Sequence, residues 1–315
     1  MAAGLLVLVA LLGLIGPAIT NPRPHDLPVG LVGPAPAVEQ LSSAIGSKAP
    51  GAFTFTSYLG EDEARTAIDD RTIDAALVLS DGPRLIVAGA AGDPAIGAIT
   101  AVFTAAFRAQ GQTLSVETVH PFASADPHGL ILFFVVLAVL ISAVIAGALV
   151  AERVENGFAM QLLVVVLFAL LAAPVALGMA TWIAGDFGSG VWMAGAFIAL
   201  TSAALGTVVV GTARLLGRPG IALAALVLIL LDLVSSGGPL GSEFLPDVYR
   251  WLAPAMPARQ LYAALRGALY FNNGGLATPA VVLGMWLGAG VVLMLLGQLV
   301  SRRSARGAAR LVPAR

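Results

Sequence analysis

Long apolar runs and one polar stretch divide this chain into two kinds of sequence. The apolar runs occupy residues 2–20, 129–151, 160–183, 191–213, 220–235 and 278–300. A helix needs roughly 20 apolar residues to cross a hydrocarbon core about 30 Å thick, because only a helix satisfies its own backbone hydrogen bonds in lipid. The pattern predicts a polytopic α-helical membrane protein with six transmembrane helices and a polar domain between the first two.

These boundaries predict the parts of the chain. We expect a first transmembrane helix at 1–20, the polar domain at 21–128, a five-helix membrane domain at 129–301 and a basic tail at 302–315. The first apolar run could instead be a cleaved signal peptide. It lacks a basic residue before its apolar core, and that core of about 18 residues exceeds the roughly 7–15 typical of signal peptides. These features favour a retained helix.

Arginines in the short connections predict the orientation. The connection after the second apolar run, the connection between the fourth and fifth runs, and the tail share one face, with Arg153, Arg214, Arg218, Arg302, Arg303, Arg306, Arg310 and Arg315. The longer loop on the other face, 236–277, contains Arg250, Arg259 and Arg266. Because short arginine-rich connections stay in the cytoplasm, we expect a cytoplasmic C-terminus and an extracytoplasmic polar domain. The alanine, glycine and arginine content indicates a GC-rich bacterial source, and therefore the bacterial plasma membrane.

The polar domain alternates predicted strands and helices. Apolar or period-two patterns predict strands at 27–33, 53–59, 73–80, 84–89 and 113–119, and helices are expected after Pro36, at 61–70 and at 94–110. A turn signal, Asp81-Gly82-Pro83, separates the third and fourth strands. We therefore predict a small α/β domain.

Composition and motifs exclude several classes of protein. The chain is 58% hydrophobic and 11% charged, has no cysteine and has a net charge of −1. Such a charge offers no basic field for a nucleic acid, and His25, His120 and His128 are too scattered for a metal cluster. Lys48, in GSKAP, lacks the spacing of a P-loop, and neither H-E-x-x-H nor G-x-S-x-G occurs. We predict no enzyme activity, no catalytic residue, no metal and no bound cofactor.

One carboxylate falls inside an apolar run. Asp232, in LILLDLVSS, lies near the extracytoplasmic end of the fifth run. A carboxylate within the membrane is costly and is by default a functional hypothesis. The alternative is that Asp232 reaches water at the interface or caps local backbone together with Ser235 and Ser236.

The loop at 236–277 contains two amphipathic segments. They are EFLPDVYRWL (243–252) and PARQLYAALRGALY (257–270). In the second, Leu261, Leu265 and Leu269 repeat along one face of a helix, with Pro257 near its start. We expect a helical hairpin that dips into the outer leaflet, or alternatively a helix that lies in the interface.

Three short segments resemble a known family. They are HDLPVGLVGP (25–34), AERVENGFAMQLL (151–163) and AMPARQLYAALRGALY (255–270). With the layout of the whole chain, they resemble permease subunits of type-2 ABC exporters, in the subgroup with a large extracytoplasmic domain between the first two transmembrane helices, and the related phage-infection-protein group. The family usually has a cytoplasmic amphipathic helix before the first transmembrane helix, whereas this sequence opens on MAAGLLVLV.

The resemblance implies roles for several residues. The second segment corresponds to the cytoplasmic linker that contacts the ATPase in the family. The candidates for ATPase coupling are therefore Glu152, Arg153, Glu155 and Gly157. The third segment would place Pro257 and Arg266 in the outer re-entrant part.

The resemblance also implies a function and partners. We expect the permease subunit of an ATP-binding-cassette exporter that moves a hydrophobic or amphipathic substrate outward, since the predicted transmembrane helices carry almost no charge. Its partners would be a separate cytoplasmic ATPase, which binds the ATP, a second permease as a homodimer or pair, and the lipid bilayer, with no nucleic acid. The alternative is a non-transporting membrane surface protein, such as a receptor or cell-envelope scaffold, that acts through its outer domain.

Overall fold

A computed structural model describes most of the chain. The described residues are 22–80, 82–155 and 157–310, together with Val9, Leu12, Gly13 and Gly16, with side chains through Val300. Apart from those four residues, the predicted first transmembrane helix at 1–20 lies outside the described residues. So do residues 311–315 of the predicted tail.

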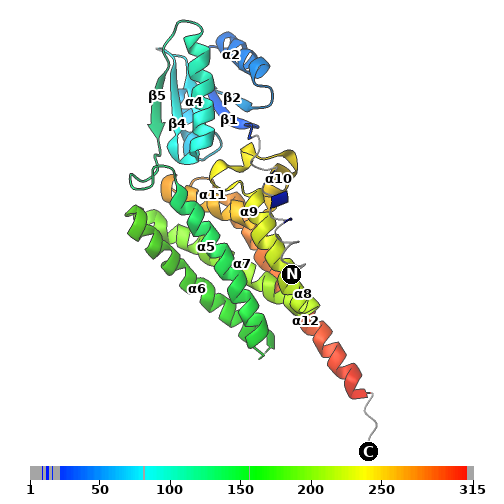
Figure 1. Ribbon diagram of the computed structural model, residues 1–315. Coiled ribbons are helices and arrows are strands. Elements are labelled where there is room, and N and C mark those ends of the chain that lie inside the picture. The colour runs from blue at the N-terminus through cyan, green and yellow to red at the C-terminus, as the bar shows by residue number, and fades with distance from the viewer. Residues whose placement is uncertain are drawn as a thin grey trace, which may run out of the picture.

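A five-stranded sheet forms the centre of the α/β domain (Figure 1). Its strands are β1 (Leu27–Val32), β2 (Phe53–Tyr58), β3 (Ala75–Val78), β4 (Arg84–Ala88) and β5 (Ser115–Val119). The order across the sheet is β2-β1-β3-β4-β5, with β3 and β4 antiparallel and the other neighbouring strands parallel. The predicted α/β domain is confirmed, and each strand lies within a predicted one.

Three helices cover the two faces of this sheet. They are α2 (Ala35–Lys48), α3 (Glu61–Asp69) and α4 (Asp93–Arg108). On one face, Val38 of α2 and Ile99 of α4 share a core with Leu77 of β3. On the other face, Ile68 of α3 shares a core with Val78 of β3. Successive side chains of a strand point to opposite faces, so Leu77 and Val78 belong to different cores.

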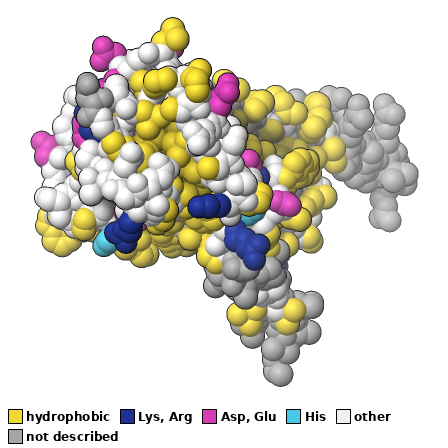
Figure 2. Space-filling view, turned by 90° about the horizontal axis from the view of Figure 1, so that it is seen from above, with side chains coloured by type: hydrophobic (Ala, Val, Ile, Leu, Met, Phe, Trp, Pro, Cys, Tyr) yellow, Lys and Arg dark blue, Asp and Glu magenta, His cyan; other side chains and the backbone are white. Residues whose placement is uncertain are grey.

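Five of the described helices are long and apolar enough to cross a membrane. They are α5 (Leu130–Arg153), α6 (Gly157–Ala184), α7 (Val191–Leu216), α12 (Ala277–Arg310), and a continuous helix formed by α8 (Arg218–Ala225), the π-helical η3 (Leu226–Leu231) and α9 (Asp232–Ser235). The most buried of them, α7, contacts α5, α6 and α12. In a view from above, many hydrophobic side chains show among the described residues beside and below the near face (Figure 2). The architecture is that of a polytopic helical membrane protein with a small α/β domain.

Two helices extend beyond the apolar runs that predicted them. The fifth apolar run, predicted at 220–235, belongs to a helical stretch that begins at Arg218, and the segment able to cross a membrane extends to Leu240. The predicted tail begins at residue 302, whereas α12 continues through Arg310. Alanine and arginine are good helix formers, so the change from apolar to basic sequence does not end the helix.

Glycines let α7 approach its neighbours closely. A Cβ atom at Gly147 of α5 would lie 3.0 Å from the backbone oxygen of Gly206 on α7. A Cβ atom at Gly211 of α7 would lie 2.5 Å from the Cβ of Leu293 on α12. Helices in lipid associate mainly through such close packing, because the surrounding tails are as apolar as the helix surfaces.

The amphipathic helix α11 (Pro257–Tyr270) lies between the helix bundle and the α/β domain (Figure 1). It occupies the predicted 257–270, and Leu261 and Leu265 of the predicted apolar face are buried in the core shared with α5 and α7. A shorter helix, α10 (Asp247–Leu252), precedes it. We call the end of the bundle next to α11 the α/β end, and the opposite end the far end.

Candidate functional site

Asp232 is a buried carboxylate near the α/β end of the bundle. Its two carboxylate oxygens accept the backbone N–H of Ala258, at 2.9 and 3.1 Å. Ala258 is the second residue of α11, so Asp232 caps a helix that comes later in the chain. A carboxylate at that place satisfies an otherwise unpaired N–H and complements the helix dipole. The partner of Asp232 is thus α11, instead of water or the backbone near Ser235 and Ser236.

The α/β domain contacts the same helix. Arg71, which follows α3, donates a hydrogen bond of 2.5 Å to the Ala263 carbonyl of α11. Its guanidinium also lies 5.2 Å from the centre of the Phe271 ring. The turn after α11 approaches so closely that a Cβ atom at Gly274 would lie 2.0 Å from the Asp69 carbonyl oxygen. These contacts connect α11 to the α/β domain, while Asp232 connects it to a membrane helix.

A polar cavity of about 410 Å³ lies where these elements meet, and we call it the junction cavity. It is bounded by the α/β domain, the loop before α11, α11 itself and the start of α12. Its charged lining residues are Asp26, Arg71, Asp74, Glu243, Arg259 and Arg266. Of these, the sequence analysis singled out Arg266 as a site candidate.

Two of the acidic groups in the junction cavity have arginine partners. The Glu243 carboxylate lies 3.3 Å from the guanidinium of Arg259, which also donates to the Ser242 hydroxyl at 2.8 Å. Asp26 accepts a hydrogen bond of 2.7 Å from Arg250, a residue outside the cavity lining. Glu243, Asp26 and Arg259 therefore each have an oppositely charged partner.

The other three charged groups are Arg71, Asp74 and Arg266. Neither the Asp74 carboxylate nor the Arg266 guanidinium has a side-chain hydrogen bond to any described residue, and the Arg266 Nε is buried. Burial raises the pKa of Asp74 to about 6, although Arg266 opposes the rise. Burial, and then repulsion from Arg266, lowers the pKa of Arg71 to about 9. Two arginines therefore lie near one carboxylate that has no ion-pair partner. This excess of positive charge favours the binding of an anion.

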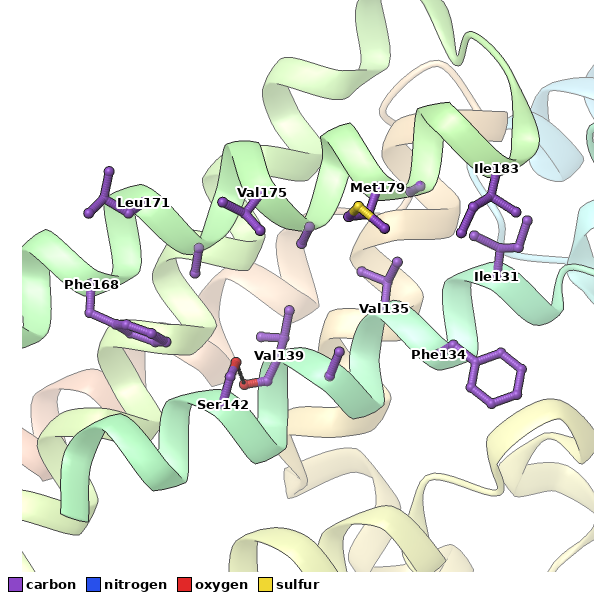
Figure 3. Close-up of a pocket in the computed structure, with 14 residues that line it drawn as sticks. Ile131, Phe134, Val135, Val139, Ser142, Phe168, Leu171, Val175, Met179 and Ile183 are labelled. Carbon is purple, nitrogen blue, oxygen red and sulfur yellow. Dashed lines mark hydrogen bonds between the residues drawn. The ribbon is translucent and has the colours of Figure 1, made fainter. Parts of the chain in front are cut away.

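An apolar hollow of about 650 Å³ lies between α5 and α6, and we call it the apolar groove (Figure 3). Its lining residues are Ile131, Phe134, Val135, Ala138, Val139, Ser142, Phe168, Leu171, Ala172, Val175, Ala176, Met179, Ala180 and Ile183. The Ser142 hydroxyl donates to the Val139 carbonyl at 3.2 Å, so the one hydroxyl of the lining is already bonded. The groove therefore suits an acyl chain or another hydrophobic group.

The four predicted coupling residues lie together at the far end. Glu152 and Arg153 end α5, Glu155 follows them, and all three are exposed. Gly157 begins α6 with a φ of 82°, a left-handed conformation that favours glycine. Asn156, between them, lies outside the described residues. The connection presents charged side chains that a partner can reach.

A polar contact connects this linker to α7. Gln161 is buried on α6, and its amide donates to the Val154 carbonyl of the linker at 2.7 Å. The Gln161 carbonyl oxygen accepts a hydrogen bond of 2.6 Å from Nε of Arg214, near the end of α7. The position of the linker thus depends on two helices besides α5.

The structure separates the predicted site residues into two groups. Glu152 and its neighbours lie at the far end, whereas Asp232, Pro257 and Arg266 lie at the α/β end. Pro257 is the buried first residue of α11, next to the N–H that Asp232 accepts. Sequence reasoning missed Gln161, although a single polar residue among apolar ones is a signal for a buried polar contact.

Comparison with protein-family models, with curated proteins and with solved structures finds no match.

Proposed function

We propose that this chain is the permease subunit of an ATP-driven exporter of the type-2 ABC class. The observation that carries the proposal is the position of the linker at 154–156. It joins α5 and α6, the same two helices that line the apolar groove. A force applied to the linker would therefore act on both walls of the site that suits a hydrophobic cargo.

Two sets of contacts support transmission of such a force. At the far end, Gln161 connects the linker to Arg214, so displacement of the linker would also shift α7. At the α/β end, Leu132 of α5 shares a core with Leu261 of α11. Because packed helices move as rigid elements, a tilt of α5 would reach α11 and the α/β domain that rests on it.

The proposal assigns the partners as follows. A separate cytoplasmic ATPase binds ATP and contacts the linker through Glu152, Arg153, Glu155 and Gly157. A second permease, identical or homologous, completes the transport path. The chain lies in the bacterial plasma membrane with the α/β domain outside and the C-terminus in the cytoplasm. It is not itself an enzyme and holds no cofactor.

The test is co-purification from native membranes in mild detergent. We expect a P-loop ATPase to co-purify with the tagged wild-type chain and to be lost from Glu152→Ala/Glu155→Ala, because both carboxylates are exposed at the proposed contact. Glu39→Ala, on the exposed surface of α2, is the matched control and should retain the ATPase. If crosslinked wild type yields no ATPase, or if the double variant retains it, the proposed coupling is wrong.

The junction cavity favours a second candidate function. A cavity with unpaired charged groups between a surface domain and a helix bundle is also suited to a non-transporting receptor. In that case a phenotype of the gene deletion would be rescued fully by Glu152→Ala/Glu155→Ala. Loss of rescue by that variant favours the permease.

A further inference from the structure

Arg266 is a guanidinium without a hydrogen-bonded partner. It lies on α11, its Nε is buried, and none of its N–H groups donates to a described residue. Its guanidinium lies 5.2 Å from the centre of the Tyr262 ring, a cation–π contact that uses none of the N–H donors. Buried polar groups are normally hydrogen-bonded. The half-buried Arg266 lines the junction cavity and has no hydrogen-bonded partner among the described residues, so a ligand in the cavity could supply one.

The charges around Arg266 define what that ligand is. Glu243 forms an ion pair with Arg259, and Asp26 forms one with Arg250. Arg71 remains close enough to Arg266 that their repulsion contributes to the lowered pKa of Arg71. One carboxylate, Asp74, faces these two cations without a hydrogen bond of its own. Outside these ion pairs, the lining therefore has two positively charged groups, Arg71 and Arg266, and one negatively charged group, Asp74.

The shape and position of the cavity limit the size and source of the ligand. Its volume of about 410 Å³ lies within the range of small-molecule sites, roughly 300–1,000 Å³. Ser236, at the end of α9, and Thr278, at the start of α12, form part of the wall. The cavity thus lies at the end of two membrane helices, where a lipid headgroup or a soluble molecule could enter.

We infer that the junction cavity binds an oxyanion group, a carboxylate or a phosphate, with Arg266 as its principal ligand. The planar fork of arginine matches both groups in two-point hydrogen bonds. Because the lining comes from both the α/β domain and α11, the bound ligand would hold these parts together. This inference does not rest on the proposed transport function.

The test is calorimetric titration of the full-length protein in an uncharged detergent. Three probes are used: inorganic phosphate, succinate and short-chain phosphatidic acid. We expect saturable binding of at least one probe to the wild type and a loss of about tenfold or more in affinity for Arg266→Met. Arg266→Lys keeps the charge without the fork and should give an intermediate affinity. Arg108→Met, on the exposed surface of α4, should bind as the wild type.

Each outcome bears on the inference. Binding of phosphatidic acid alone, with the same dependence on Arg266, identifies a lipid headgroup as the source, whereas binding of phosphate or succinate identifies a soluble anion. Asp74→Asn should bind an anion as well as the wild type or more tightly. Absence of saturable binding for all three probes, wild-type affinity in Arg266→Met, or loss of anion binding in Asp74→Asn would overturn the inference. Melting curves without ligand show whether each variant is folded.

Discussion

The carboxylate of Asp232 accepts the backbone N–H of Ala258, and through this contact a membrane helix holds the start of α11. Helix α11 also accepts, at its Ala263 carbonyl, a hydrogen bond from Arg71 of the α/β domain. One short helix therefore receives a polar contact from the bundle and another from the domain. Asp232 does not contact the α/β domain directly. It holds α11, the helix on which the domain rests.

Removal of the Asp232 side chain should destabilise this junction. Asp232→Ala leaves the buried Ala258 N–H without its acceptor, which costs about 1–3 kcal/mol. Asp232→Asn keeps one acceptor oxygen and should recover part of that loss. Thermal unfolding in detergent, together with hydrogen exchange at the start of α11, measures both effects. Asp247→Ala, whose side chain is 92% exposed, is the control. Equal stability of Asp232→Ala and the wild type would contradict the capping role.

Replacement of Gln161 should disturb the far end. Gln161→Leu keeps the volume but removes the acceptor of Arg214 and the donor to Val154, at a cost of about 1–3 kcal/mol for the polar groups left unpaired. The expected results are a lower melting temperature and faster hydrogen exchange in the linker. Gln110→Leu, on the exposed end of the α/β domain, is the control. Unchanged exchange in the linker would show that Gln161 does not hold it.

A methyl group at Gly147 should separate α5 from α7. Gly147→Ala would place a Cβ atom 3.0 Å from the Gly206 carbonyl and 2.9 Å from Val209, so the two helices must move apart at a cost of about 1–3 kcal/mol. Gly178→Ala on α6 meets no atom within 4 Å and is the matched control. Melting temperatures in detergent compare the two. A Gly147→Ala protein at least as stable as Gly178→Ala would mean that the close approach is unnecessary.

Asp74 should give the stability a specific pH dependence. Burial raises its pKa from 3.8 to about 6, and the charges that face it are Arg266, Glu243, Arg71 and Arg259. The folded state therefore holds this proton more tightly than the unfolded state. The stabilisation is complete below about pH 4 and is lost as the pH rises through about 6.

The variant Asp74→Asn isolates that contribution. It should be more stable than the wild type at neutral pH, by at most about 3 kcal/mol and by less where water enters the cavity. Near pH 4 the two proteins should be similar. Melting temperatures across this pH range measure the difference, with the exposed Asp62→Asn as control. Parallel curves for the wild type and Asp74→Asn would exclude the assigned shift.

Local patterns in the sequence predicted the elements but not their partners. Alternation and apolar runs placed all five strands, and the spacing of Leu261 and Leu265 placed the buried face of α11. The partner of Asp232 could not be predicted, because Ala258 is separated from it by 26 positions and carries no signal in its side chain. A capping side chain next to its helix in the sequence can be recognised, but one that comes from a distant helix cannot.

The junction cavity was equally hidden from sequence reasoning. Arg71 and Asp74 lie in the connection between α3 and β3, where charged residues are ordinary. Only the packing of the domain on α11 brings them to Arg266. The linker at the far end was predicted from the end of an apolar run, and its coupling role from a family resemblance in its short motif. Its support by Gln161 and Arg214 depends on the crossing of α6 and α7, which the motif does not contain.

The shortness of the connection between α5 and α6 restricts how these helices can separate. Only residues 154–156 lie between them, so Arg153 and Gly157 stay within roughly 14 Å of each other even when the connection is fully extended. Any widening must therefore be a pivot about the linker, growing with distance from it. The apolar groove is lined by 131–142 of α5 and 168–183 of α6, beyond the first turns from that pivot. A small angular change at the linker would thus alter the width of the groove most at its end near the α/β domain.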